Sequence, residues 1–233
     1  MRYNLIFNVN LLIPMRFTEK LNTPGDYPFL ISGPIGQLEV ELTVPEQANR
    51  HYVAIIGHPH SLQGGTMRNK VVTTMARAFK ELGIASLRFN FRGVGQTAGA
   101  YDAGIGESED MLFLAQRWLQ EMPEVTLLFA GFSFGSYVAY RAAAQSAHAL
   151  LITIAPSVHH YDYTEFTPSP SPWIVVQGDA DEIVPAQLVV DFATQAKPPL
   201  RLLPFTETGH FFHGKLIELK LRLMDAIREQ GIV

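Results

Sequence analysis

The segment VTLLFAGFSFGSYVAYRAAA, residues 125–144, decides the fold. Its first seven residues form an apolar run of the length of a buried strand, and residues 136–146 have helical periodicity. Between them, Gly131-Phe132-Ser133-Phe134-Gly135 fits the pattern G-x-S-x-G. In a strand-turn-helix setting, this pattern exposes the serine hydroxyl above the sheet, and the glycines let strand and helix approach closely. Ser133 is therefore predicted to be a nucleophile, the alternative being an ordinary glycine-rich turn.

Working outward from this segment, strand-like and helix-like stretches alternate along the chain. Gly33-Pro34 and Gly36 divide two alternating apolar runs in residues 29–44, which predicts an antiparallel hairpin. Strands separated by helices indicate a parallel sheet covered on both faces. We therefore expect an α/β fold with a mostly parallel sheet of about eight strands. The further strands are expected at 52–57, 84–90, 125–131, 149–155, 173–178 and 200–205, and the helices at 71–82, 107–122, 136–146, 186–196 and 212–229.

Composition favours one globular domain. Of 233 residues, 47% are hydrophobic and 17% charged, which is enough apolar material for a sizeable core. Eighteen basic and 22 acidic residues give a net charge of −4, without a block of like charge, so nucleic acid is not an expected partner. The absence of cysteine excludes disulfides, a thiol nucleophile and cysteine-ligated metal.

The start of the chain, MRYNLIFNVNLLIPM, is apolar but interrupted by Asn8 and Asn10. We interpret residues 1–28 as an extension or an edge strand preceding a domain at 29–233, with a signal peptide as the open alternative. No stretch approaches the roughly 18 to 20 continuous apolar residues of a membrane-spanning helix. A cytoplasmic protein without a membrane partner is the expectation.

A serine nucleophile needs an adjacent base, because its hydroxyl is scarcely ionised at neutral pH. His210 lies in TETGHFFHG, after the last expected strand and next to Gly209, where a loop can reach over the carboxyl edge of the sheet. His213, three residues later, is the rival. We expect His210 to be the general base.

The loop GDADEIVP, residues 178–185, supplies a carboxylate between serine and histidine in the chain. That order, Ser, Asp, His, is the one found with a nucleophile at a strand-turn-helix junction. Asp179, Asp181 and Glu182 compete for the role. Asp181 is preferred because it lies at the apex of the loop, whereas Glu182 is expected to face solvent or cap the next helix.

An oxyanion formed at the serine also needs hydrogen-bond donors. The backbone N–H of Phe134, directly after the nucleophile, is one, and the loop at residues 57–65 is expected to supply the other through the backbone N–H of His60. His58 and His60 lack a third ligand, so a metal site is not predicted.

Arg92 either binds a substrate carboxylate or holds loops together, and the second interpretation is favoured.

Together these residues resemble the α/β-hydrolase superfamily over about residues 29–230. GHPHSLQGGTMRNKVV, LRFNFRGVGQTAG, AGFSFGSYVA, GDADEIVP and GHFFHGK are similar to segments of small bacterial hydrolases without a cap, a group that resembles dienelactone hydrolases and peptidase-like hydrolases. The resemblance implies a triad of Ser133, Asp181 and His210, an oxyanion hole at Phe134 and His60, and no cofactor. His58-Pro59 replaces the usual His-Gly, which leaves the second oxyanion donor open.

A cap in this superfamily would follow the strand at 149–155. Only PSVHHYDYTEFTPSPSP separates that strand from the next, too little for a helical lid. An open site favours small-molecule esters with short acyl groups, so we expect a carboxylesterase-like serine hydrolase that works through an acyl-enzyme. A thioesterase, a peptidase or amidase, and a non-catalytic binding module remain alternatives, and the sequence does not distinguish a monomer from a homodimer.

Overall fold

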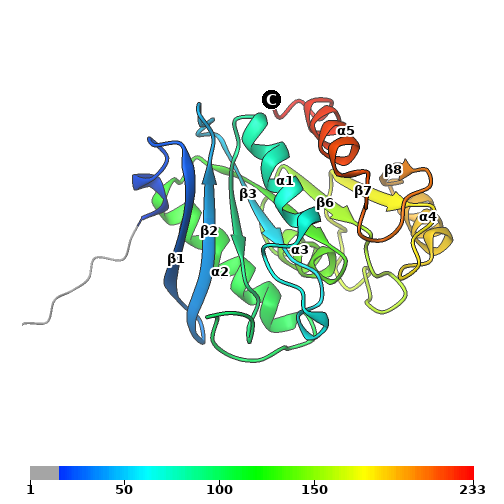
Figure 1. Ribbon diagram of the computed structural model, residues 1–233, viewed down its shortest axis with the longest axis horizontal. Helices are drawn as coiled ribbons and strands as arrows, with labels where there is room; N and C mark the ends of the chain where they lie inside the picture. The colour runs from blue at the N-terminus through cyan, green and yellow to red at the C-terminus, as the bar shows by residue number, and fades with distance from the viewer. Residues whose placement is uncertain (1–15) are drawn as a thin grey trace, which may run out of the picture.

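An eight-stranded sheet forms the middle of the structure, a computed structural model that describes residues 16–233. The strands lie in the order β1-β2-β4-β3-β5-β6-β7-β8 (Figure 1). This confirms the expected sheet of about eight strands. The strands are β1 (Gly25–Gly33), β2 (Gly36–Val44), β3 (Tyr52–Gly57), β4 (Ala85–Phe89), β5 (Thr126–Phe132), β6 (Leu150–Ile154), β7 (Trp173–Gly178) and β8 (Arg201–Phe205).

Strand directions follow the expected pattern. β2 is antiparallel to both β1 and β4, and the pairs from β4 through to β8 are parallel. β1 begins at Gly25, upstream of the expected domain start at residue 29. Before it, η1 (Phe17–Glu19) places the buried Phe17 ring 4.8 Å from that of Trp118. The extension or signal peptide considered for the first residues falls, over 1–15, outside the described residues.

Helices cover both faces of the sheet (Figure 1). Successive side chains of a strand point to opposite faces, so Leu127 and Phe129 of β5 pack in the core under α2, α3 and α4, and Leu128 and Ala130 pack under α1 and α5. No helix within residues 16–233 is both long enough and apolar enough to cross a membrane. The helices are α1 (Lys70–Glu81), α2 (Ile105–Glu121), α3 (Phe134–Ala144), α4 (Ala186–Gln195) and α5 (Leu216–Arg228), with a short η2 (Ser61–Gln63).

The last helix begins later than its apolar pattern predicts. The expected start was residue 212, but α5 begins at Leu216. Phe212 has φ 55° and Gly214 has φ 73°, backbone angles that a right-handed helix does not contain. Phe212 is nevertheless buried, with its ring 5.3 Å from that of Phe205. Its apolar side chain therefore packs in the core although the residue belongs to a turn and not to the helix.

The connection between β6 and β7 is a strap without helix or strand. Its aromatic residues lie against α3: the Tyr163 ring is 5.1 Å from that of Tyr140, and the Phe166 backbone N–H donates to the Tyr140 hydroxyl at 3.2 Å. The connection therefore forms no helical cap, as expected.

Arg92, in the loop after β4, binds a carboxylate of the protein itself. Its Nε donates to Asp110 Oδ2 at 2.8 Å and its Nη2 to Asp110 Oδ1 at 3.0 Å. The Asp110 side chain is fully buried and that of Arg92 is 8% exposed. Arg92 therefore ties this loop to α2, in keeping with the favoured role as a link between loops.

Replacing Asp110 with asparagine should destabilise the fold, because a buried guanidinium would lose its charged partner. We expect Asp110→Asn to lower the free energy of unfolding, measured by urea denaturation, by on the order of 3 kcal/mol. Glu109→Gln is the matched control: its carboxylate lies 3.5 Å from Arg92 but is 63% exposed, so a change below about 1 kcal/mol is expected. Equal losses in both variants would contradict this account.

Candidate active site

Ser133, Asp181 and His210 all lie at the carboxyl edge of the sheet. Ser133 follows β5 directly, Asp181 lies in the loop after β7, and His210 lies in the loop after β8. Because these strands are parallel, their carboxyl ends share one edge. Residues separated by as many as 77 positions thus reach one another.

A continuous chain of hydrogen-bond contacts joins the three side chains. His210 Nε2 lies 3.1 Å from Ser133 Oγ, and His210 Nδ1 lies 2.9 Å from Asp181 Oδ2 and 3.1 Å from Oδ1. The side chains of His210 and Asp181 are 2% and 0% exposed. The structure thus brings together the three residues expected as nucleophile, base and orienting acid.

The Asp181 carboxylate determines the tautomer of His210. Burial alone would raise the pKa of Asp181, but the hydrogen bonds from His210 and from the backbone N–H groups of Val184 and Ile183 outweigh burial and lower it. The carboxylate is therefore ionised at neutral pH and only accepts hydrogen bonds. Nδ1 of His210 must carry the ring proton, which leaves the Nε2 lone pair facing the serine.

Ser133 lies in a strained turn that glycines make possible. Its backbone has φ 55° and ψ −121°, a region that a non-glycine residue rarely adopts, and its N–H donates to the Ile154 carbonyl at 2.8 Å. A Cβ at Gly131 would lie 2.0 Å from the Gly135 carbonyl oxygen, and one at Gly135 would lie 2.5 Å from the Gly57 carbonyl oxygen. Glycine is therefore required wherever β3, β5 and the start of α3 meet.

Comparison with known proteins agrees with this geometry. A solved α/β serine hydrolase homologue from Coxiella burnetii is 44% identical and matches 86% of this chain and 97% of its own, with a TM-score of 0.83. A lidless α/β serine hydrolase from Xanthomonas campestris is also 44% identical, over 89% and 95% of the two chains, with a TM-score of 0.84. The chain belongs to the α/β-hydrolase superfamily.

More distant comparisons add little to this assignment. An uncharacterised protein of Rickettsia prowazekii is 33% identical over 205 residues, which is 83% of this α/β-hydrolase and 85% of the relative. No family model matches the chain.

Two residues that hold this hydrolase site together escape sequence reasoning. Glu182, expected to face solvent or cap a helix, is exposed and in addition accepts the His210 backbone N–H through Oε2 at 3.0 Å. A Cβ at Gly209 would lie 2.7 Å from that oxygen, so the glycine makes room for the carboxylate. Gln177 donates from Nε2 to Asp181 Oδ2 at 3.1 Å and is 2% exposed. A lone amide in the otherwise apolar strand WIVVQG was the available signal for Gln177.

The rival side chains lie elsewhere. Asp179 is exposed, and its Oδ1 lies 3.4 Å from the Thr208 backbone N–H rather than against the imidazole of His210. His213 is exposed, and its ring packs 6.0 Å from that of Phe211. Within the described residues, neither Asp179 nor His213 has a hydrogen bond or ring contact that joins its side chain to Ser133 or to the imidazole of His210.

His58 has a structural role in the loop after β3. Its Nε2 accepts the Phe91 backbone N–H at 2.9 Å, so Nδ1 carries the proton and donates to the Pro59 carbonyl at 2.6 Å. Burial lowers the pKa of His58 to about 4, against the bond to Pro59, which raises it. A neutral His58 thus ties this loop to the end of β4.

Within residues 16–233, no three histidine or acidic side chains are grouped so as to hold a metal ion.

The two proposed oxyanion donors belong to neighbouring segments. The His60 ring lies 5.0 Å from the Phe134 ring, and His60 Nδ1 accepts the Leu62 backbone N–H at 3.3 Å. The backbone N–H groups of Phe134 and His60 have no hydrogen-bond acceptor among the described residues.

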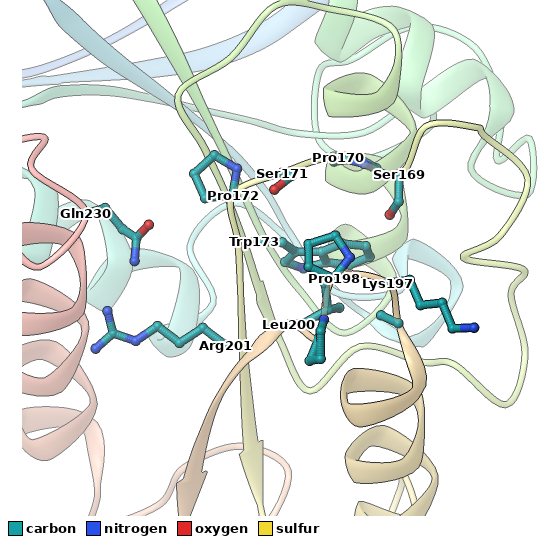
Figure 2. A pocket seen from close by; sticks show the side chains of 12 residues that line it. Ser169, Pro170, Ser171, Pro172, Trp173, Lys197, Pro198, Leu200, Arg201 and Gln230 are labelled. Carbon is teal, nitrogen blue, oxygen red and sulfur yellow. The ribbon is translucent and has the colours of Figure 1, made fainter.

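A separate hollow of about 150 Å³ lies at the amino ends of the parallel strands β7 and β8 (Figure 2). Trp173 and Arg201, which line it, begin β7 and β8, whereas Asp181 and His210 follow the ends of these strands. This hollow is therefore not part of the candidate active site.

Replacing Gly135 with alanine should destabilise the turn that carries Ser133. Helix propensity alone would make this change stabilising by up to about 1 kcal/mol. The new methyl group would instead meet the Gly57 backbone, so we expect a loss of roughly 1–3 kcal/mol, measured as a lower melting temperature. A raised melting temperature would show that α3 and β3 are not held in contact here.

Proposed function

We propose that this α/β-hydrolase cleaves carboxylic esters with short acyl groups through an acyl-enzyme on Ser133. The observation that carries the proposal is the hydrogen-bonded chain from Asp181 through His210 to Ser133. Membership of the superfamily supports a hydrolase, and the chemistry of this site supports acyl transfer.

In the first half of the reaction, the Nε2 lone pair of His210 accepts the Ser133 hydroxyl proton while Oγ attacks the acyl carbon. Asp181 stabilises the imidazolium that forms, through the hydrogen bond at Nδ1. The carbonyl oxygen becomes an oxyanion, for which the backbone N–H groups of Phe134 and His60 are the proposed donors. Collapse of this intermediate breaks the ester bond, and His210 returns the proton to the leaving alcohol.

In the second half, water attacks the acyl group on Ser133. His210 accepts a proton from the water, the same donors stabilise the second oxyanion, and the proton passes to Ser133 Oγ as the acid leaves. The enzyme returns to its starting state. Every proton in this scheme moves through Nε2 of His210, which the geometry places toward the serine.

The proposed short-acyl preference rests on the missing cap. The strap between β6 and β7 packs on α3, and apolar side chains stand exposed on loops that carry or adjoin the triad: Leu62 at 71%, Ile183 at 44% and Phe211 at 37%. Such side chains offer contacts for a small apolar group without enclosing a long one.

Replacing the nucleophile tests the proposal directly. We expect wild-type protein to react covalently with a fluorophosphonate and to hydrolyse p-nitrophenyl acetate, and we expect Ser133→Ala to do neither while its melting temperature is preserved. Mass spectrometry of the labelled protein and release of p-nitrophenol are the measurements. Turnover by Ser133→Ala at the wild-type rate would refute the assignment.

Two amide variants test which acid in the loop after β7 orients His210. Asp181→Asn removes the acceptor that holds the Nδ1 proton of His210, so kcat should fall by on the order of 10³ to 10⁴. Asp179→Asn leaves the imidazole contacts in place and should keep kcat within a fewfold of wild type. If Asp179→Asn is the inactive variant, the orienting acid is Asp179.

Acyl-chain length tests the open site. Burial of each CH₂ group contributes about 0.8 kcal/mol only where a wall covers it, so kcat/KM should be higher for acetyl to butyryl than for dodecanoyl p-nitrophenyl esters. A series measured at constant detergent and pH provides the comparison. A steady rise of kcat/KM up to dodecanoyl would overturn the short-acyl preference, and cleavage of thioesters or amides in preference to esters would overturn the substrate class.

A further inference from the structure

A second hollow, of about 290 Å³, lies beside the candidate active site. One wall comes from the segment that leads from η2 into α1, and the other comes from the turn that follows His210. Its lining residues are Gly64, Thr66, Arg68, Asn69, Lys70, Phe211 and His213.

Phe211 connects the hollow with the triad. Its ring centroid lies 5.0 Å from that of His210, with the two rings perpendicular, and 6.0 Å from that of His213. One aromatic side chain therefore contacts the triad imidazole and also lines the hollow.

The hollow is positively charged. Arg68 and Lys70 are exposed, and neither has a carboxylate within ion-pair distance among the described residues. No acidic residue lines the hollow. Lys215, further along the segment that follows Phe211, by contrast pairs with Glu218 at 3.4 Å.

The helix start adds to this positive potential. Lys70 is the first residue of α1, and the first turn of that helix contains no acid. A cation at a helix N-terminus opposes the helix dipole and is unfavourable by roughly 0.3–1 kcal/mol. Arg68 also borders a neighbouring hollow lined by two acids, of which Glu41 is paired with Arg88 and Asp26 accepts a hydrogen bond from Thr43 at 2.6 Å. An anionic ligand would relieve the repulsion between these positive groups.

We infer that this hollow binds a carboxylate or phosphate on the leaving alcohol of the substrate. The inference rests on the proposed function. Its direction follows from His210, which must reach the leaving oxygen to protonate it, so the leaving group lies on the His210 side. Phe211 and the hollow are on that side. The enzyme therefore prefers esters whose alcohol carries a negative charge.

Matched esters test the charge and its position. The first pair is 4-acetoxybenzoate and its neutral methyl ester, and 4-acetoxyphenyl phosphate replaces the carboxylate with a phosphate. The second pair, p-nitrophenyl hemisuccinate and p-nitrophenyl butyrate, places the charge on the acyl side. We compare the ratio of kcat/KM for the anionic ester over the neutral ester within each pair, in wild type and variants.

The double variant Arg68→Gln/Lys70→Gln should lower the ratio for the first pair on the order of fivefold to tenfold, as expected for two exposed charge contacts. Lys80→Gln is the matched control, because it makes the same change further along α1 and outside this hollow. We expect Lys80→Gln to keep the wild-type ratio, and we expect added salt to reduce the ratio in wild type. An unchanged ratio in the double variant, or a drop confined to the hemisuccinate pair, would overturn the inference.

A binding measurement keeps this test independent of catalysis. The product 4-hydroxybenzoate should raise the melting temperature of wild type and Lys80→Gln but not of Arg68→Gln/Lys70→Gln. An equal rise in all three proteins, or none in wild type, would overturn the inference. If instead no ester is hydrolysed while the product still binds through Arg68 and Lys70, the proposed function fails and the anion site stands.

Discussion

The contact between Gly57, Gly131 and Gly135 is the constraint on which the site depends. A Cβ at Gly131 in β5 would lie 2.0 Å from the Gly135 carbonyl oxygen in α3, and a Cβ at Gly135 would lie 2.5 Å from the Gly57 carbonyl oxygen in β3. Because the positions are glycine, the start of α3 packs directly on the two strands, and Ser133 is held at φ 55°. In the same region the Phe134 ring lies 5.0 Å from the ring of His60, in the loop after β3.

Hydrogen bonds within and between the loops after β7 and β8 hold Asp181 and His210 in place. Asp181 accepts two backbone N–H groups and the Gln177 amide besides the imidazole of His210. His210 is held at both ends, by Glu182 at its backbone N–H and by Asp181 at Nδ1. The loops after β7 and β8 thus fix each other, and these contacts hold the imidazole in one orientation.

Charged and polar groups near this edge fall into two kinds. Arg92 and His58 are buried and fully engaged, Arg92 with Asp110 and His58 with two backbone groups, so they hold loops in place. Arg68 and Lys70 are exposed and lack acidic partners among the described residues. An unpaired charge at the surface loses little hydration and remains available to a ligand, whereas a buried charge must find its partner within the protein.

The sequence alone determined the strands and helices, their α/β arrangement and the choice of Ser133, Asp181 and His210 as site residues. These follow from short-range signals: apolar periodicity, the glycines around Ser133, and the order of polar residues after successive strands. The catalytic roles of the three residues remain predictions. Only the tertiary structure decided that Glu182 holds the His210 backbone, that Arg92 binds Asp110, that His58 is neutral, and that α5 begins at Leu216 rather than 212. The physical reason is that these outcomes depend on burial and on partners brought together by packing. The local pattern of apolar residues contains no information about either.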